Sequence, residues 1–380
     1  MSTTPEPAMK VLLERGSSVA WRGASTLGSS ALQVLSAGMS PEKEKLLRYK
    51  ASYLSGVALT KPRGISLELS TACNLHCKIC HQWKDNREKQ ALDEHDVKGI
   101  IDDIAAHFPH AVLEFSGQEP TMNAPLLFFA LEYAQQKGVQ TALNTNGMVV
   151  DRAFAERLVA AEPHHISVSL DGVHAQTHDY LRHMRGSHAK VVRAVQSLVA
   201  AKESMRSRSA VAVTTVLCDT NLEEMPEMHA FAASLGAESL NYNAFVLDNS
   251  YFLAPRERYE ECEFWVKEQR LPVLEGVVQD ILALKEAGAR PAITNDARQL
   301  RNFPEYFRNK ANFSKGKCLA GYNYFHIHKL GDVTVCGKGP FLNVKQYPLH
   351  EIWHSYSYYR TRQLIKQCDV PCLNNCFTLL

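Results

Sequence analysis

The stretch that decides the fold of this chain is ISLELSTACNLHCKIC, residues 65–80. Its first six residues are typical of a buried strand, and the polar residues after them end that strand in a loop. The loop carries Cys73, Cys77 and Cys80 at the spacing C-x3-C-x2-C. Three thiolates can bind three irons of a cubane cluster and leave the fourth iron open, whereas iron–sulfur clusters usually take four cysteines. An open metal position is a place for a substrate or cofactor to bind.

The same three thiols have a structural alternative. Together with His76 or His81 they could hold a zinc ion. Structural zinc sites more often use paired C-x2-C units, so the spacing favours the iron–sulfur interpretation and leaves zinc as the alternative.

Downstream of the loop, short β-branched runs alternate with amphipathic stretches of helical length. We predict strands at 65–70, 112–117, 141–147, 166–172, 210–218 and 239–246. Helices between them are predicted at 93–108, 125–137, 151–161, 188–202 and 222–235. Six such repeats indicate a parallel sheet covered by helices. A closed eight-stranded barrel would need two more units, so the predicted fold class is α/β, a partial (β/α)6 TIM-like barrel.

Short polar motifs stand at the ends of the predicted strands. The second strand ends in SGQEP (116–120), the third in NTNG (144–147) and the fourth in SVSLDG (167–172), and HDYLR follows at 178–182. Together with the cysteine loop, these motifs resemble the radical S-adenosylmethionine (SAM) superfamily over roughly residues 65–250. Their ordered placement matters because barrel active sites gather at the carboxyl ends of the strands.

The resemblance implies that Cys73, Cys77 and Cys80 bind a [4Fe–4S] cluster whose open iron chelates SAM. It also implies that a glycine- and acid-containing segment binds the methionine amino group of SAM. Glu119 is the acceptor by position, which suits a carboxylate facing an ammonium. The same segment contains Gly117 and also Gln118, which stands where the family has a second glycine.

Further residues are expected beside the cofactor on the same grounds. The resemblance places Asn144 and Asn146 in a turn next to SAM, and makes Ser169 and Asp171 candidates for its ribose hydroxyls or for the substrate. An arginine that reaches the SAM carboxylate would be Arg182. Ile79 stands where many members carry an aromatic residue and is expected to cover the adenine.

Five of the ten cysteines lie in the last 63 residues. Segments 324–328 and 333–336 flank KLGD (329–332), which is typical of a β-hairpin, and 349–366 reads as one helix. The arrangement resembles the auxiliary-cluster extension called SPASM, or its shorter form, twitch. A full SPASM domain has seven cysteines and two clusters, so five cysteines imply one auxiliary [4Fe–4S] cluster. The first-choice ligands are Cys318, Cys336, Cys372 and Cys376, with Cys368 as the alternative and zinc as the structural alternative.

Other residues with metal-binding or site chemistry receive simpler interpretations. Without a secretion signal, clustered thiols are better explained as metal ligands than as disulfides. Lone cysteines are often buried small side chains, which is the prediction for Cys218 and Cys262. Histidines that pack or face solvent are expected at 164, 165, 326 and 328. Residues expected to line the substrate mouth after the last strand are Tyr242, Asn243 and Asp248.

Composition excludes some classes of protein. The net charge of +2 gives no reason to expect nucleic acid as a partner, and no apolar stretch is long enough for a transmembrane segment. The expected location is cytoplasmic. We predict three domains: an N-terminal helical extension (1–60) with a helix from Ser40 to Leu54, the partial barrel (61–290), and the auxiliary-cluster domain of hairpin and helix (291–380). A substrate- or membrane-surface role is the alternative for the extension.

Three functional interpretations follow. The first is an oxidoreductase-type radical SAM enzyme that forms a 5′-deoxyadenosyl radical and oxidises or epimerises a small-molecule substrate of the sugar or aminocyclitol class. The second is a maturase of a ribosomally made peptide, although residues 1–60 lack the strand pattern of a leader-binding module. The third is a non-catalytic metal-binding scaffold. An enzyme of this kind implies a flavodoxin or ferredoxin as electron donor; the catalytic base is left unassigned.

Overall fold

The computed structural model describes residues 39–80, 82–84, 91–246, 261–309, 318–336, 338–368 and 372–373. Within these ranges one ten-stranded sheet has the order β10-β9-β8-β1-β2-β3-β4-β5-β6-β7. The strands are β1 (Gly64–Leu67), β2 (Val112–Phe115), β3 (Gln140–Thr145), β4 (His165–Ser169), β5 (Ala210–Leu217), β6 (Ser239–Ala244), β7 (Ala292–Ile293), β8 (Tyr324–Ile327), β9 (Asp332–Val335) and β10 (Lys338–Asn343). Strands β1–β6 pair in parallel and in chain order, which confirms the predicted α/β partial barrel.

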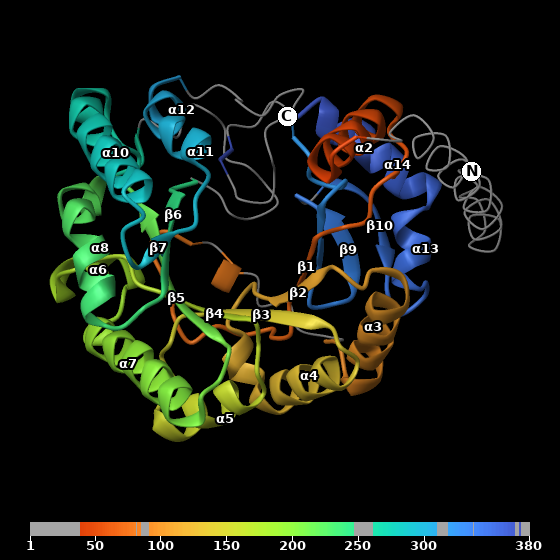
Figure 1. Ribbon diagram of the computed structural model, residues 1–380, viewed down its shortest axis with the longest axis horizontal. Helices are drawn as coiled ribbons and strands as arrows, with labels where there is room; N and C mark the ends of the chain where they lie inside the picture. The colour runs from red at the N-terminus through yellow and green to blue at the C-terminus, as the bar shows by residue number, and fades with distance from the viewer. Residues whose placement is uncertain are drawn as a thin grey trace, which may run out of the picture.

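Helices lie on the convex outer side of the curved sheet (Figure 1). The barrel helices are α3 (Glu94–His107), α4 (Ala124–Gln136), α5 (Arg152–Ala160), α6 (Ala175–Arg182), α7 (Ser187–Met205), α8 (Met225–Ser234) and α10 (Leu271–Glu286), followed by α11 (Ala297–Arg301) and α12 (Phe303–Asn309). Each predicted barrel helix is present. The short α6 was not predicted, since its eight residues are too few for a clear periodicity.

Acidic caps fix where some of these helices begin. The Asp93 side chain accepts from the Asp96 amide while Asp96 accepts in return, a complete capping box at the start of α3. At α5 the carboxylate of Asp151 accepts from the amide of Phe154. Each cap satisfies an otherwise unpaired backbone donor and contributes about 1 kcal/mol. These local signals explain why the sequence locates the helices well.

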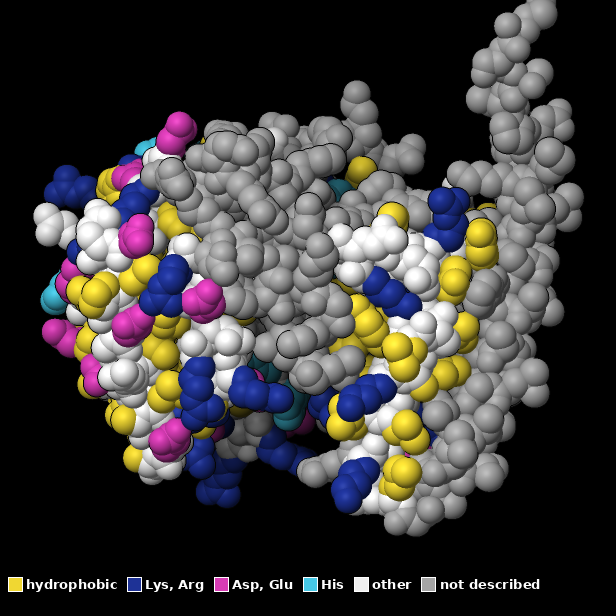
Figure 2. All heavy atoms as spheres, turned by 90° about the horizontal axis from the view of Figure 1, so that it is seen from above, with side chains coloured by type: hydrophobic (Ala, Val, Ile, Leu, Met, Phe, Trp, Pro, Cys, Tyr) yellow, Lys and Arg dark blue, Asp and Glu magenta, His cyan; other side chains and the backbone are white. Residues whose placement is uncertain are grey.

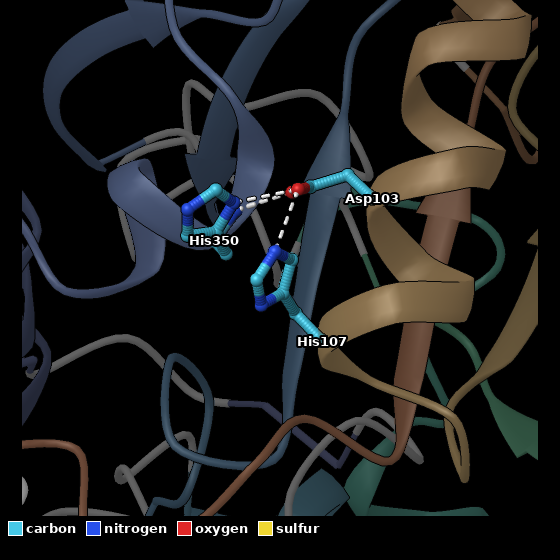
Figure 3. Close-up of side chains that lie close together, drawn as sticks. All are labelled: Asp103, His107 and His350. Carbon is cyan, nitrogen blue, oxygen red and sulfur yellow. Dashed lines mark hydrogen bonds and ion pairs between the residues drawn. The ribbon is translucent and has the colours of Figure 1, made fainter.

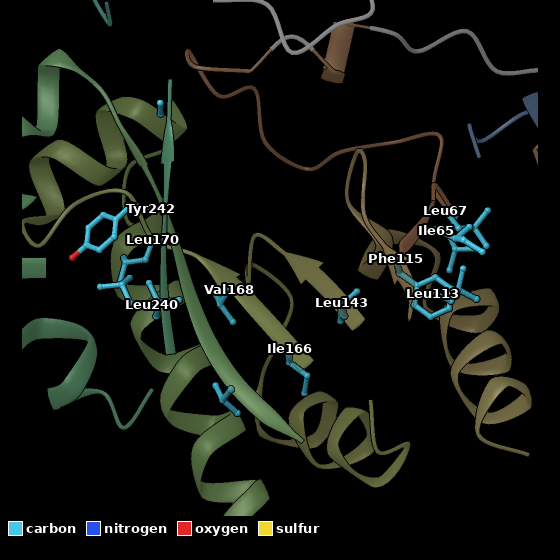
Figure 4. Close-up of a cluster of buried hydrophobic side chains, with 14 of the residues drawn as sticks. Ile65, Leu67, Leu113, Phe115, Leu143, Ile166, Val168, Leu170, Leu240 and Tyr242 are labelled. Carbon is cyan, nitrogen blue, oxygen red and sulfur yellow. The ribbon is translucent and has the colours of Figure 1, made fainter. Parts of the chain in front are cut away.

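The apolar core lies between the sheet and its helices (Figure 4). Register places Leu67, Phe115, Leu143 and Ile166 in one row across β1–β4, and all four side chains are fully buried. Burial of such side chains contributes about 1.5–3 kcal/mol each. Because side chains alternate along a strand, the intervening positions face the inside of the barrel. Many of those positions are polar, and the functional site is built from them.

The C-terminal strands extend the barrel sheet. Strand β8 pairs in parallel with β1, while β8, β9 and β10 pair antiparallel with one another in order. The predicted hairpin is therefore confirmed, and it has a third strand. At the other edge β7 pairs with β6. The sheet thus continues across residue 290, and the domain boundaries at 60 and 290 stay predictions.

Three further helices gather beside β8–β10 in Figure 1. They are α2 (Pro41–Ser55), α13 (Leu349–Trp353) and α14 (Tyr356–Lys366). Ser40 caps α2 as predicted, accepting from the Lys43 amide. The rest of the N-terminal extension, residues 1–38, lies outside the described residues. None of the helices in the described ranges has the length and hydrophobicity of a membrane span.

The prediction of one helix over 349–366 is wrong. The helix breaks at His354 and restarts at Ser355, whose backbone is extended and whose hydroxyl accepts from the Tyr358 amide. A serine of this kind competes with the helical backbone and caps a new helix instead. The break lets Trp353 and Tyr358 pack together, with ring centroids 5.4 Å apart.

Replacing Ser355 with alanine removes this cap. We expect Ser355→Ala to lower the free energy of unfolding by about 0.5–2 kcal/mol, measured by urea unfolding at matched cluster content. Ser204→Ala is the control, because its hydroxyl only donates back to the Ala201 carbonyl within α7. An equal effect of the two substitutions contradicts the capping role.

Candidate active site

The cysteine loop leaves the carboxyl end of β1 and is fastened to three other segments. The amide of Lys78 donates to the carbonyl of Leu181 at 2.9 Å, which ties the loop to α6. The amide of Glu119 donates to the carbonyl of Ala72 at 3.3 Å, and the Trp83 indole donates to the carbonyl of Cys77 at 3.2 Å. Hydrogen bonds to the backbone of the loop therefore help to hold it in place.

The three thiols of this loop lie close enough to influence one another. The pKa of Cys73 is raised to about 12, mainly by burial and also by the nearby Glu119, Cys77 and Cys80. Burial also raises the pKa of the Cys77 and Cys80 thiols. Buried thiols of this kind are poor free anions, whereas coordination to a metal cation deprotonates a thiol outright. The donor set therefore fits a bound iron–sulfur cluster.

The spacing of the thiols argues against a single zinc ion. With zinc–sulfur bonds of about 2.3 Å, ligand sulfurs of one zinc lie roughly 3.8 Å apart. The three cysteines do not form such a close group. In the part of the chain that the structure describes, the one set of three donor atoms within 4.8 Å of one another lies on α3 and α13. Of the proposed completing histidines, His76 is exposed and packs against Trp83, and His81 lies outside the described residues.

Glu119 stands at the end of β2, buried and facing the cysteine loop. Its Oε1 atom accepts from the Thr121 amide, the Thr121 hydroxyl and the Thr145 hydroxyl, and its Oε2 atom accepts from the Asn146 amide at 2.7 Å. Burial raises the pKa of Glu119, and these hydrogen bonds oppose the rise. The carboxylate is thus fixed in direction beside Cys73, as a cation-binding group must be.

Asn146 connects this carboxylate with the cysteine loop. Its side-chain nitrogen donates to Asn74 Oδ1 at 2.7 Å and lies 3.9 Å from the sulfur of Cys73. Its amide binds Glu119, as described above. The third strand therefore supplies the contacts that hold the first two motifs together.

Gly117 and Gln118 occupy the turn between β2 and Glu119. Gly117 has a φ of +106°, and a Cβ there would lie 2.3 Å from Cγ of Glu68, so only glycine fits. The side chain of Gln118 donates to the carbonyl of Gln82 at 3.0 Å. Glutamine in place of the family's glycine thus adds a link between this turn and the segment after the cysteines.

Arg182 and Asp171 form a buried ion pair next to the thiols. The guanidinium lies 2.6 Å from Asp171 Oδ2 and 3.9 Å from the sulfur of Cys77, and Asp171 is fully buried. Asp171 Oδ1 accepts from the amide of Val216. The structure therefore places Asp171 behind Arg182, where it holds the arginine, and places Arg182 at the cysteine loop, where a cofactor carboxylate is expected.

The remaining predicted cofactor residues line the same end of the barrel. Ile79 is a buried residue of the cysteine loop, and Asn144 donates to Glu114 on the neighbouring strand. Ser169 continues the inner row of Ser167, whose hydroxyl lies 2.6 Å from that of Thr214. The inner face of the barrel is therefore polar from β2 to β5.

A carboxylate between two histidines lies at the β1–β8 junction. Glu68 Oε1 lies 3.0 Å from Nε2 of His326, and Oε2 lies 3.4 Å from Nε2 of His328 and accepts from the amide of Lys329. Nδ1 of His326 also lies 2.9 Å from the hydroxyl of Ser66. The sequence prediction of packing or solvent-facing histidines missed this contact, because it joins strands about 260 residues apart. Figure 2 shows a hollow bordered by Lys and Arg side chains with His side chains within it.

The prediction that Tyr242 lines the substrate mouth is wrong. Tyr242 is fully buried among the apolar side chains of Figure 4, and burial raises its pKa. Strand alternation explains the error. Tyr242 lies on the outer face of β6, whereas Asn241 and Asn243 face inward and hydrogen-bond each other at 3.0 Å. Asp248 lies outside the described residues.

The C-terminal thiols gather around Cys318. The pKa of Cys318 is raised to about 12, mainly by burial and also by the neighbouring thiols of Cys336 and Cys368. This proximity favours Cys368 as a ligand, which the sequence treated only as an alternative. Cys372 packs at the edge of the core, and Cys376 lies outside the described residues.

Comparisons with known proteins agree with this geometry. The family model of the radical SAM superfamily matches residues 67–232, and that of the SPASM iron–sulfur cluster-binding domain matches residues 318–377. The chain belongs to the radical SAM superfamily and carries a SPASM-type extension. Its cofactors are accordingly SAM, a [4Fe–4S] cluster and an auxiliary cluster.

Individual relatives match between about half and most of the chain. An AdoMet-dependent heme synthase of Methanosarcina barkeri is 27% identical over 80% of this radical SAM protein and 86% of its own length. The mycofactocin maturase MftC of Mycobacterium tuberculosis is 30% identical over 47% of this chain and 44% of its own.

Solved structures show the same fold at low identity. The structure of anSMEcpe with bound AdoMet has a TM-score of 0.62 and 15% identity, covering 81% of this chain and 84% of its own. Streptococcus suis SuiB bound to precursor peptide SuiA has a TM-score of 0.61 and 14% identity, covering 88% and 77%.

The buried ion pair gives a prediction about stability. Asp171→Asn leaves the Arg182 charge buried without its partner, which costs about 3–5 kcal/mol of unfolding free energy. Glu156→Gln is the control, since it breaks an exposed pair with Arg152 worth no more than about 0.5 kcal/mol. Thermal unfolding at matched cluster content measures both. Similar losses in the two variants are inconsistent with a buried pair.

Glu68 gives a prediction about pH. Burial alone would raise its pKa, but His326, His328 and the Lys329 amide together lower it. A carboxyl with a lowered folded pKa stabilises the protein above its unfolded pKa of about 4.3, and this stabilisation is lost as the pH falls through the folded pKa. We expect Glu68→Gln to flatten the dependence of the unfolding free energy on pH below about 4.3.

The measurement is a series of thermal unfolding midpoints between about pH 3 and pH 6. Glu203→Gln, which removes an exposed carboxyl on α7, is the matched control and should keep the slope of the parent protein. A parent-like slope in Glu68→Gln would show that the two histidines do not act on this carboxyl.

Proposed function

We propose that this protein is an oxidoreductase-type radical SAM enzyme acting on a small polar metabolite held inside the barrel. The observation that carries the proposal is the meeting of three thiols, a fixed carboxylate and a buried arginine at the carboxyl ends of β1–β4. When bound, the cofactors supply one electron and a 5′-deoxyadenosyl radical that abstracts hydrogen from a substrate carbon. The protein's own groups bind and orient the cofactors and the substrate, and they exclude competing reactions.

Each group has a distinct task in this proposal. Cys73, Cys77 and Cys80 hold the cluster, and Glu119 accepts from the amino group of SAM through the lone pairs left beside its fixed hydrogen bonds. Arg182, kept cationic by Asp171, faces the carboxylate of SAM. Such prior positioning removes the cost of ordering these groups during the reaction.

The polar inner face supports a small hydrophilic substrate. Ser66, Glu114, Asn144 and Ser167 occupy adjoining strands, and hydrogen-bonding groups of this kind suit hydroxyls or amines. The heme synthase relative, a small-molecule enzyme by name, matches 80% of the chain. The narrower sugar or aminocyclitol class rests on the polar lining, since the relatives described above are not enzymes of that class.

A peptide substrate is the second candidate. The observation that favours it is the mycofactocin maturase, which is 30% identical over almost half of the chain. The C-terminal thiols serve both candidates, because an auxiliary cluster near Cys318 can accept the second electron of an oxidation. Either enzyme needs a flavodoxin or ferredoxin donor and a reducing compartment such as the cytoplasm, where unpaired thiols persist.

Iron content and SAM cleavage test the proposal. Anaerobically reconstituted protein should hold about eight irons, as expected for two [4Fe–4S] clusters. Combined replacement of Cys73, Cys77 and Cys80 by alanine should leave about four irons and abolish 5′-deoxyadenosine formation from SAM under reduction. The control Cys262→Ala removes a thiol outside both groups and should keep both properties. A fully loaded parent protein that never forms 5′-deoxyadenosine would overturn the enzymatic proposal.

Substrate fractions separate the two candidates. A small-molecule extract should raise the rate of 5′-deoxyadenosine formation by the loaded enzyme, while a peptide fraction of the same extract should not. The reverse result supports the maturase and contradicts the small-molecule proposal.

A further inference from the structure

Three donor side chains outside the active site converge on one point of the surface. Asp103 and His107 stand one turn apart on α3, so they share a face of that helix. His350 comes from α13, almost 250 residues later in the chain. One ligand atom of each lies within 4.8 Å of the other two, the one such triad in the ranges that the structure describes.

The geometry of this triad resembles a metal-binding site (Figure 3). Nδ1 of His350 lies 2.6 Å from Asp103 Oδ1, and Nε2 of His107 lies 3.5 Å from the same oxygen. The two imidazole rings stack, with centroids 3.8 Å apart and planes at 21°. Both rings therefore present a nitrogen toward the same carboxylate.

These distances are compatible with one metal ion. Ligand bonds of about 2.0–2.2 Å in a tetrahedral zinc site place neighbouring donor atoms roughly 3.3–3.6 Å apart. The His107–Asp103 pair already has this spacing, and the His350–Asp103 pair needs to open by about 1 Å as a cation replaces its hydrogen bond. Imidazole nitrogen and carboxylate oxygen are ordinary ligands of zinc and related ions.

Solvent can reach the triad. The side chains of Asp103, His107 and His350 are 13%, 45% and 22% exposed, so an ion can enter and a water can complete the coordination. We propose that Asp103, His107 and His350 bind a zinc-class divalent cation. This ion is separate from both iron–sulfur clusters.

The position of the site assigns it a structural task. Helix α3 begins after the cysteine loop and runs back to the start of β2, so its last turn lies at the end of the sheet opposite Cys73. The cation joins α13 to α3, and thereby fastens the C-terminal extension to the barrel. The inference does not rest on the proposed function.

A contact without metal is the competing explanation. The backbone amide of His350 also donates to Asp103 Oδ2 at 2.6 Å, so the carboxylate already binds the first turn of α13. Such a hydrogen-bonded contact predicts no preference for zinc. His107 distinguishes the two explanations, because it makes neither of the hydrogen bonds between Asp103 and His350 but is a ligand of the ion.

The test uses cluster-loaded protein, in which the cluster-binding thiols are occupied. After equilibrium dialysis against dilute zinc chloride, the parent protein should retain about one more zinc than His350→Ala, and His107→Ala should bind that zinc at least about 10-fold more weakly. His110→Ala, an exposed histidine just after α3, is the matched control and should bind like the parent.

A second measurement covers the case in which a variant folds poorly. Zinc should raise the thermal unfolding midpoint of the parent and of His110→Ala, and should leave that of His107→Ala unchanged, because a ligand that binds the folded state stabilises it. Equal zinc retention and equal midpoint shifts in the parent and in His107→Ala would overturn the proposal and leave the hydrogen-bonded contact.

Discussion

The parallel pairing of β1 with both β2 and β8 is the constraint on which the rest of the structure depends. One neighbour brings Glu119 to the cysteine loop, and the other brings His326 to Glu68. The carboxyl ends of parallel strands share one edge of a sheet. The strand order alone therefore brings residues far apart in sequence together at that edge. Strand alternation then divides apolar outer from polar inner side chains, so packing and chemistry do not compete for the same positions.

Much of the barrel could be predicted because its signals are local. Strand and helix patterns and acidic caps each extend over fewer than about 20 residues, and they give the six parallel units correctly. The loop cysteines, Glu119, Asn146 and Arg182 stand at strand or helix ends, where topology alone brings them together. Contacts such as Asn146 to Asn74 follow from that placement.

Other features could not be predicted because they depend on residues far away in the sequence, or on which face of a strand a residue occupies. The prediction for Tyr242 depends on its position at the end of a strand. A shift of one residue along a strand moves a side chain to the opposite face, and Tyr242 is buried on the outer one. Ser355 ends one helix and begins another within a continuous amphipathic pattern. The contact of Glu68 with His326 and His328, and the approach of Cys368 to Cys318, both require the late strands to be placed first.

The place of β8 has a consequence for how the chain is made. β1 lies near the beginning of the described barrel, but its second neighbour is synthesised some 260 residues later. Until then one edge of the emerging sheet has no partner strand from β8, and unpaired edges recruit other chains. Contacts so distant along the sequence also close slowly. The sheet is therefore completed only when β8 pairs with β1 late in synthesis, and a nascent chain that stops short of β8 leaves its first strand open to association.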